Sequence, residues 1–261
     1  MHTSPSPLDT ARLVRQTFVA RVEHHPVLDS TNDRAQRCAA EGSPPLPLLI
    51  VVDRQTAGRG RGANRWWTGE GGLACSLLVD LAAAGIERSQ SPLVSLAAAM
   101  AVVETVAPLL PSHAVGLRWP NDVYADGRKL AGILIEGLAG GLAVAGIGLN
   151  ANNTMADAPA ELRPIATTLR DLTGGPHDPT SILVELLRHL ESLLGRLVSD
   201  PASVAARADA VCLQRGQMLA LESGGRTVGG RCAGIAPDGA LLLDTPEGRQ
   251  QFYSGVLRWR G

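Results

Sequence analysis

A glycine- and arginine-rich loop that directly follows an apolar run constrains this chain more than any other feature. Residues 48–52 are all aliphatic, as in a buried strand. Residues 55–66 read Gln-Thr-Ala-Gly-Arg-Gly-Arg-Gly-Ala-Asn-Arg-Trp, which sets three arginines among three glycines before a tryptophan. Glycine lets the backbone approach a ligand, arginine binds carboxylates and phosphates through paired hydrogen bonds, and tryptophan offers a flat face to an aromatic base. The loop is therefore suited to hold a carboxylic acid beside a nucleotide, which points to carboxylate activation.

The same loop has two other interpretations. Gly58, Gly60 and Ala63 have the spacing of the dinucleotide-binding fingerprint, and Asp80 lies about where that fingerprint places an acidic residue. We reject this interpretation because the fingerprint must open a helix, and residues 65–72 are poor helix formers. A solvated basic loop without a ligand also fits these residues when they are taken alone.

Composition narrows the class of protein. A chain of 261 residues with 45% hydrophobic content can form one large domain, or a mid-sized domain and a small one. The net charge of −1 disfavours nucleic acid or an anionic membrane as a partner. The four cysteines lack the spacing of a zinc site or a disulfide framework. Residues 1–25 lack the apolar segment of a signal peptide, and the apolar residues 93–110 are interrupted by polar ones, so we expect a cytoplasmic protein.

Periodicity and turn residues predict the order of elements. The pattern indicates strands over residues 18–23, 48–53 and 73–81, strand-like residues 115–119 and 124 that lead into a hairpin turn at residues 126–127, and a second hairpin over 130–149. It indicates helices over 33–41, 93–110, 180–198 (capped by Thr180) and 201–213. From residue 216 the texture changes to short strands separated by glycine-containing turns, over residues 218–222, 228–235, 240–243 and 251–257. This spacing is typical of a small β-barrel, so we place a domain boundary near residue 213.

A second motif combines polar groups at a predicted hairpin. Residues 118–123 read Arg-Trp-Pro-Asn-Asp-Val, and residues 129–136 read Lys-Leu-Ala-Gly-Ile-Leu-Ile-Glu. Asn121 and Asp122 follow one strand and Lys129 begins the returning strand. The hairpin would therefore bring an amide, a carboxylate and an ammonium to one end of a sheet. An ordinary Asn-Asp turn with a surface lysine fits the same residues.

Two shorter segments carry weaker signals. Residues 146–150 read Gly-Ile-Gly-Leu-Asn, at the end of a predicted strand, where glycine is also typical of a β-bulge. Ser30, Thr31 and Asn32 precede a predicted helix, and capping alone accounts for them. The same hydroxyls and amide are able to hydrogen-bond a polar ligand ring.

Taken in order, these segments resemble the biotin protein ligases. The resemblance covers about residues 18–155 at the level of motifs, and the last β-segment resembles that family's SH3-like barrel. It implies an α+β fold of the class II aminoacyl-tRNA synthetase and biotin ligase type, in which a mixed β-sheet packs on helices. The implied domains are a catalytic domain of residues 1–213 and an SH3-like domain of residues 214–261. Asn64 stands where the family has a loop arginine, with Arg65 displaced next to Trp66, and Arg118 replaces a lysine that often precedes the Trp-Pro-Asn-Asp motif.

The resemblance also implies a reaction. An enzyme of this family uses Mg²⁺ and ATP to activate biotin as biotinyl-5'-AMP, then transfers biotin to a lysine of a biotin carboxyl carrier protein. No nucleic acid or membrane partner is expected. The sequence does not fix the oligomeric state, and a homodimer is one possibility. A lipoate or octanoate ligase or transferase on the same fold is the main alternative. A biotin-responsive transcriptional repressor is disfavoured, because about twenty residues before the first strand are too few for a DNA-binding module, so we expect the monofunctional type.

The family pattern assigns roles to particular residues. Biotin would be bound by Ser30, Thr31, Asn32, Gln55, Arg59, Gly60, Arg61 and Lys129. ATP would be bound by Arg61, Arg65, Trp66, Asn121, Asp122 and Asn150, with Asp122 also facing Mg²⁺. The catalytic residues would be Lys129, Arg59 and Asp122. The sequence contains none of the motifs of an enzyme nucleophile, which agrees with direct attack of one substrate on the other.

Overall fold

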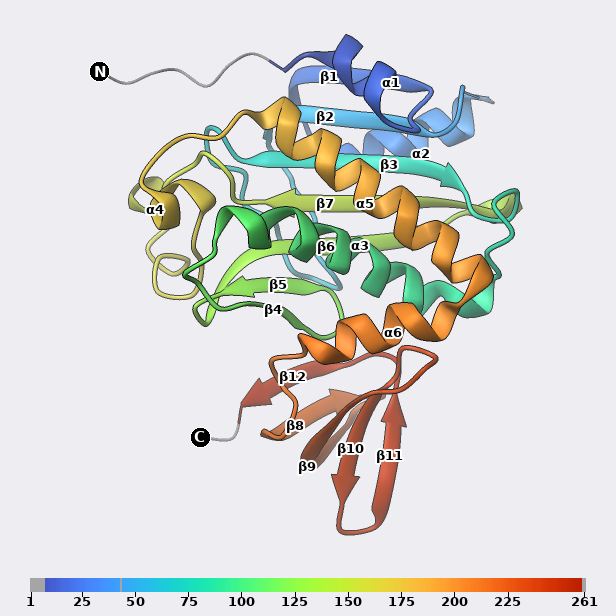
Figure 1. Ribbon diagram of the computed structural model, residues 1–261, viewed down its shortest axis with the longest axis vertical. Helices are drawn as coiled ribbons and strands as arrows, with labels where there is room; N and C mark the ends of the chain where they lie inside the picture. Colours follow the sequence, from blue (N-terminus) through green and yellow to red (C-terminus); the bar gives the residue numbers. More distant parts are fainter. Residues whose placement is uncertain (1–7, 43, 260–261) are drawn as a thin grey trace.

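A seven-stranded mixed sheet forms the centre of the larger part of the molecule. The computed structural model describes residues 8–42 and 44–259. The strands lie in the order β1-β2-β3-β7-β6-β5-β4, and the β1–β2 pair is parallel whereas the other pairs are antiparallel (Figure 1). Their bounds are β1 (Arg21–Leu28), β2 (Leu48–Gln55), β3 (Leu73–Asp80), β4 (Val115–Arg118), β5 (Asp122–Ala125), β6 (Arg128–Gly137) and β7 (Leu142–Leu149). The result is the expected α+β class.

Helices cover both faces of this sheet. On one face α3 (Ser91–Val106) packs against α5 (Pro179–Ser199) and α6 (Pro201–Ala210). The helix α2 (Thr31–Glu41) covers the other face. The helices α1 (Thr10–Gln16) and α4 (Leu169–Thr173) are short, and α1 contacts α5 and β1 (Figure 1). The strands β2, β3 and β7 are therefore buried on both sides, which explains why their sequences are almost entirely apolar.

The helix α3 lies in the middle of the core. Residues 97–99 and 101 are alanines, and all four are fully buried, so the helix approaches the sheet and α5 closely. Together with its flanking turns, the segment Arg88–Leu109 is long and apolar enough to cross a membrane, but 67% of its most apolar window is buried inside the fold. Burial of this kind is typical of a core helix.

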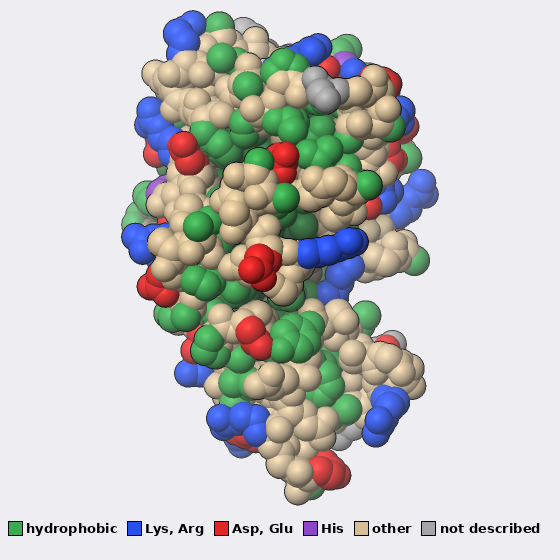
Figure 2. All heavy atoms as spheres, turned by 90° about the vertical axis from the view of Figure 1, so that its right-hand side faces the viewer, with side chains coloured by type: hydrophobic (Ala, Val, Ile, Leu, Met, Phe, Trp, Pro, Cys, Tyr) green, Lys and Arg blue, Asp and Glu red, His purple; other side chains and the backbone are tan. Residues whose placement is uncertain are grey.

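A second, smaller sheet is built from the last part of the chain. Its strands are β8 (Met218–Ser223), β9 (Arg226–Ile235), β10 (Leu241–Thr245), β11 (Gly248–Phe252) and β12 (Val256–Trp259), in the antiparallel order β11-β10-β9-β8-β12. In the space-filling view it forms a lower lobe that is set off from the larger part by a notch on one side (Figure 2).

Several element boundaries differ from those predicted. The first strand spans Arg21–Leu28 rather than 18–23, since Val19 is buried in the core and pairing with β2 begins only at Arg21. The helix α5 is capped by Asp178 and not by Thr180, whose hydroxyl accepts a hydrogen bond from the Asp9 amide instead.

Two further boundaries were wrong near the second sheet. Residues 251–257 are not one strand but the end of β11 and the start of β12, which lie at opposite edges of the sheet. The helix α6 ends at Ala210 rather than near residue 213, because residues 211–213 pair with β4, where the Leu117 amide donates to the Val211 carbonyl at 2.9 Å.

Candidate active site

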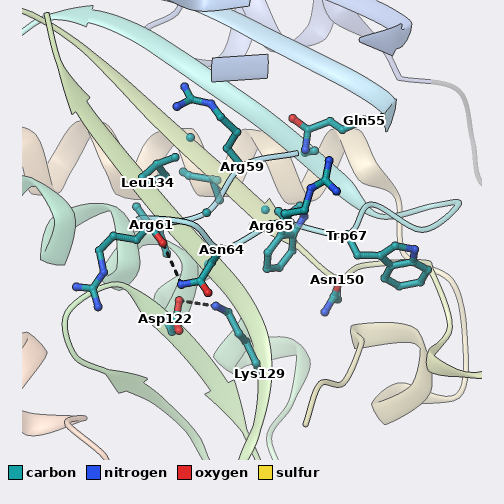
Figure 3. A pocket seen from close by; sticks show the side chains of 18 of the residues that line it. Gln55, Arg59, Arg61, Asn64, Arg65, Trp67, Asp122, Lys129, Leu134 and Asn150 are labelled. Atoms are coloured by element: carbon teal, nitrogen blue, oxygen red, sulfur yellow. Dashed lines mark hydrogen bonds and ion pairs between the residues drawn. The ribbon is translucent and has the colours of Figure 1, made fainter. Parts of the chain in front are cut away.

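One cavity of about 380 Å³ opens on the α2 face of the large sheet. It lies between the start of α2, the glycine-rich loop and the strands β5, β6 and β7 (Figure 3). Every residue assigned from the sequence to biotin or ATP lines this cavity: Ser30, Thr31, Asn32, Gln55, Arg59, Gly60, Arg61, Arg65, Trp66, Asn121, Asp122, Lys129 and Asn150. Motifs up to 120 residues apart in the sequence therefore share one site.

A buried polar network closes one end of the cavity. Ser30 caps α2, and the Thr31 amide donates to Gln55 Oε1 at 2.9 Å. The Ser76 hydroxyl lies 2.7 Å from the Thr31 hydroxyl and 2.6 Å from Asn32 Oδ1. Ser30, Thr31 and Asn32 are each at most 3% exposed. Capping is thus only part of their role, because the same groups form a rigid polar wall.

Glycines of β6 and β7 make room for side chains above the sheet. A Cβ at Gly146 would lie 2.0 Å from Asn32 Oδ1, and one at Gly148 would lie 2.3 Å from Trp66 Cε2. A Cβ at Gly132 would lie 3.3 Å from Trp66 Cζ3. The β6–β7 register is continuous through these positions, so the glycines mark close approach rather than a bulge. The Trp66 indole therefore rests on a floor of bare backbone.

Arg59 is anchored to the sheet at the polar end of the cavity. Its guanidinium donates to both carboxylate oxygens of Glu136, at 2.9 and 2.6 Å, and lies 2.8 Å from an Asp33 oxygen. Glu136 also accepts from Asn32 Nδ2 at 2.7 Å. Sequence reasoning missed this role of Glu136 and Asp33. Glu136 ends the motif of residues 129–136, but nothing local indicates a partner 77 positions away.

Arg61 points toward the small sheet. Its guanidinium donates to the backbone carbonyl of Gly255, in the turn between β11 and β12. Burial lowers the pKa of Arg61, whereas the charge of Asp122 acts in the opposite direction. Arg61 remains a cation, because the pKa of a guanidinium starts far above neutral pH.

Lys129 and Asp122 form an ion pair on neighbouring strands. Lys129 Nζ lies 2.7 Å from Asp122 Oδ1, and 5.8 Å from the centre of the Trp66 ring. Both side chains are partly exposed to the cavity, at 32% and 23%. Next to them, Asn121 Nδ2 donates to the Ile133 carbonyl, which ties the start of β5 to β6. The hairpin thus brings the predicted ammonium, carboxylate and amide together.

The three cations Arg59, Arg61 and Lys129 line one cavity without meeting in it. Each is held by its own acceptor, and the close-up shows Arg59 and Arg61 directed to different sides (Figure 3).

The other end of the cavity is built by residues that the sequence did not indicate. The segment 151–168 runs beside β6, where the Lys129 amide donates to the Ile165 carbonyl at 2.8 Å. Asn153 Nδ2 donates to Asn150 Oδ1 at 3.2 Å, and apolar groups line the wall, namely Trp67, Met155, Leu162 and Ile165. This segment has no regular periodicity, so pattern analysis could not place it.

Cys75 also lines this cavity, but its thiol is not poised as a nucleophile. Burial raises the pKa of its thiol to about 12, so the group is neutral near pH 7. The described residues also contain no cluster of three or more His, Cys, Asp or Glu side chains that would hold a metal ion.

Comparisons with known proteins agree with this geometry. Residues 25–152 match the model of the biotin/lipoate A/B protein ligase family, and residues 216–256 match the biotin protein ligase C-terminal domain. The biotin–[acetyl-CoA-carboxylase] ligase of Mycobacterium tuberculosis is 37% identical over 82% of this chain and 80% of its own length. The bifunctional ligase/repressor BirA of Bacillus subtilis is 32% identical over 90% of this chain and 72% of its own length.

A solved structure gives the same result. The biotin protein ligase of Aquifex aeolicus in complex with biotin and ATP superimposes with a TM-score of 0.82, at 28% identity, over 92% of this chain and 100% of that one. The chain therefore belongs to the biotin/lipoate A/B protein ligase family.

Proposed function

We propose that this chain is an ATP-dependent ligase that activates biotin as biotinyl-5'-AMP and transfers the biotinyl group to a lysine of a biotin carboxyl carrier protein. The observation that carries the proposal is the single cavity that combines a buried polar wall, a glycine floor under Trp66 and the Lys129–Asp122 pair. The names of the relatives and the bound biotin and ATP of the Aquifex enzyme support the same reaction.

The cavity divides into two ends for two substrates. The polar wall of Ser30, Thr31, Asn32 and Gln55 would bind the ring of biotin, with Gly60 backbone beside it. The end with Arg65, Trp66 and Asn150 would bind the adenine and ribose of ATP. The acid and the α-phosphate would then meet over Gly132, next to Lys129.

The reaction needs two anions to approach each other. A carboxylate oxygen of biotin attacks the α-phosphorus, the bond to the β-phosphate breaks, and pyrophosphate leaves. The Lys129 ammonium, which lines the cavity, would stabilise the negative charge that grows on the phosphate oxygens. In the second step the acceptor amine attacks the acyl carbon, AMP leaves, and the amine loses a proton. Asp122, released from Lys129, would orient that amine.

The arginines have different parts in this proposal. Arg61 would exchange the Gly255 carbonyl for the phosphate, because an anionic phosphate oxygen is a stronger acceptor than a neutral carbonyl. Arg59 would keep its two carboxylates and hold the loop over the biotin end through its backbone and that of Gly60. Arg65 would supply the positive charge that the family places at the position of Asn64.

Mg²⁺ fits this site as an ion that arrives with ATP. Magnesium is usually bound by one or two carboxylates and by substrate phosphates rather than by a cage of protein ligands. Asp122 supplies one carboxylate at the phosphate end of the cavity, and Asn121 has its amide oxygen free of the bond to Ile133. The ion would neutralise phosphate charge there.

The remaining assignments concern the whole chain. We propose a catalytic domain of residues 1–213 and an SH3-like domain of residues 214–261, a cytoplasmic location, and no nucleic-acid or membrane partner. The near-neutral net charge supports the absence of a nucleic-acid or anionic-membrane partner. A homodimer through a free edge of the large sheet is compatible with the exposed strand β1.

Biotin-dependent ATP–pyrophosphate exchange tests the proposal. We expect exchange with biotin and much less with lipoate or octanoate, because the buried polar wall offers hydrogen bonds that an alkyl chain leaves unpaired. Faster exchange with lipoate or octanoate would favour a ligase for those acids. Transfer to a purified biotin carboxyl carrier domain, followed by mass, tests the second step.

A repressor is the second candidate, since the Bacillus subtilis relative combines both activities. A gel-shift assay with DNA from upstream of biotin-related operons, with and without biotin and ATP, separates the two. We expect no ligand-dependent complex.

A further inference from the structure

Gln214 lies at the junction of the two sheets, next to a motif of the active site. It is fully buried, with 0% exposure. Its side-chain oxygen accepts from the Trp119 amide at 3.0 Å, and its side-chain nitrogen donates to the Trp119 carbonyl at 3.1 Å. Both polar ends of one amide are therefore used to grip the backbone of one residue.

These two hydrogen bonds take the place of a neighbouring strand at the outer edge of β4. The strand β4 is the last of the large sheet, and its outer edge pairs with residues 211–213, where the Leu213 amide donates to the Leu117 carbonyl at 2.9 Å. β4 ends at Arg118, and the Gln214 amide continues the pairing to Trp119, as a backbone would. A buried backbone group must find such a partner or lose stability.

Trp119 is also held from the small sheet. It is 2% exposed, and its indole nitrogen donates to the Gly239 carbonyl at 3.0 Å, just before β10. From Trp119 the chain runs directly into Asn121 and Asp122. Asp122 is the partner of Lys129 at 2.7 Å. Contacts from the small sheet thus end three residues from an ion pair of the cavity.

We infer that Gln214 is a positioning residue for the ligase reaction, which sets the place of Asn121 and Asp122, and through Asp122 that of Lys129, by clamping the backbone of Trp119. This inference rests on the proposed function. It assigns the small domain a role in the first chemical step, since Gln214 is its first residue and Gly239 belongs to it. Gln214 itself touches neither substrate.

The test compares two glutamines of similar position and different environment. Gln214→Met keeps the volume and removes both hydrogen bonds to Trp119, together with the 3.4 Å hydrogen bond that Gln214 Oε1 accepts from the Cys212 thiol. Gln217→Met changes an exposed side chain three residues on. We expect Gln214→Met to lower kcat for biotin-dependent ATP–pyrophosphate exchange by about 10- to 100-fold, because displacements of about 1 Å cost on that order. The Kd of biotin alone, bound at the far end of the cavity, should change by less than about twofold. Gln217→Met should match wild type in both.

Gln214→Glu gives a readout that a merely structural role would not move. Burial raises the pKa of a carboxyl group, and a protonated carboxyl can both accept from the Trp119 amide and donate to its carbonyl. The exchange rate of Gln214→Glu relative to wild type should therefore rise as pH is lowered from 8 toward 6. The ratio cancels the pH dependence of the wild-type enzyme.

Hydrogen exchange measured by mass spectrometry on ligand-free protein provides a readout that is independent of activity. Gln214→Met should speed amide hydrogen exchange in residues 116–124, and Gln217→Met should not. The inference is overturned if Gln214→Met keeps kcat within about twofold of wild type, or if kcat and biotin affinity fall together. It is also overturned if the ATP–pyrophosphate exchange rate of Gln214→Glu, divided by that of wild type, does not change between pH 8 and pH 6. If wild type itself shows no biotin-dependent exchange, the proposed function fails, while the hydrogen-exchange result still decides whether Gln214 holds this segment.

Discussion

At the scale of single residues, Lys129 is the cation best placed for chemistry. Its acceptor, Asp122, is itself a predicted site residue, whereas Arg59 and Arg61 are bound by groups outside the predicted set. A compact ammonium on a flexible side chain can move from that carboxylate to a phosphate without a change in the surrounding backbone.

Lys129→Ala should therefore reduce biotin-dependent exchange by about 10²–10³-fold, the usual cost of removing one preorganised charge donor from a transition state. Steady-state exchange under saturating biotin and ATP measures it. Arg188→Ala serves as a control, because Arg188 is an exposed residue on α5 that pairs with Glu185. A loss of less than tenfold would contradict the role given to Lys129.

Gly148 is the glycine that lies closest to the Trp66 indole. A methyl group there would lie 2.3 Å from Trp66 Cε2, so Gly148→Ala must displace the indole. We expect the KM for ATP to rise about tenfold, in line with the 1–3 kcal/mol that overpacking usually costs. Gly137→Ala, on the same sheet with nothing within 4 Å, should leave KM unchanged. Equal effects of the two substitutions would argue against the glycine floor.

At the scale of elements, local sequence patterns predicted the helix ends and hairpins that depend on neighbouring residues. The helix α2 ends at Gly42 as expected, and the predicted hairpin turn at residues 126–127 and the predicted hairpin over 130–149 are present as the β5–β6 and β6–β7 pairs, because capping residues, glycine turns and apolar runs act over a few positions. The strand β1 was misplaced because it is a mostly exposed edge strand whose bounds depend on pairing with β2. The break at residues 253–255 likewise follows from strand pairing across the small sheet.

The candidate site shows the same division. Each motif was identified from its own residues, and the structure places all of them around one cavity. The acceptors that hold Arg59 and Arg61, Glu136 and the Gly255 carbonyl, lie 77 and 194 positions away. Contacts at that distance come from the tertiary fold and leave no trace in local spacing.

The N-terminus of α5 gives a prediction at this scale. Asp178 caps the helix, accepting from the Thr180 and Ser181 amides. Burial alone would raise the pKa of Asp178, but hydrogen bonds from Ser181 and Thr180 and the charge of Arg12 together lower it. A lowered pKa means that the carboxylate stabilises the folded state above its unfolded pKa, and that this stability is lost as pH falls through the folded value.

Asp178→Ala should accordingly reduce the free energy of unfolding at pH 7 by about 1 kcal/mol, as is usual for a lost cap. The difference from wild type should shrink as pH is lowered below about 4, the unfolded pKa of an aspartate. Urea unfolding followed by circular dichroism at several pH values measures both. A difference that stays constant down to pH 3 would rule out the charged cap as its source.

At the scale of the whole molecule, the glycine-rich loop is a bridge between the two sheets. Arg59 ties it to Glu136 of the large sheet, and Arg61 ties it to the turn before β12 of the small one. Ligand binding that draws Arg61 inward would exchange one of these ties for contacts with substrate, so the loop should become more protected when both substrates are present.

Limited trypsin digestion checks this expectation, since the loop contains three arginines within residues 58–65. With biotin and ATP at about ten times their Kd, cleavage there should slow about tenfold, because only the unliganded loop opens to the protease. Cleavage elsewhere in the chain serves as the internal reference. Equal cleavage with and without substrates would show that the loop does not close over them.

The position of Trp66 also makes the protein its own optical sensor. Trp66 and Trp67 both line the cavity, whereas Trp119 is sealed at the junction of the sheets. The Trp66 indole rests on bare backbone with an ammonium 5.8 Å from its ring, so any molecule that settles there changes what this chromophore touches. Its emission should therefore shift on titration with substrate, without any dye attached to the chain.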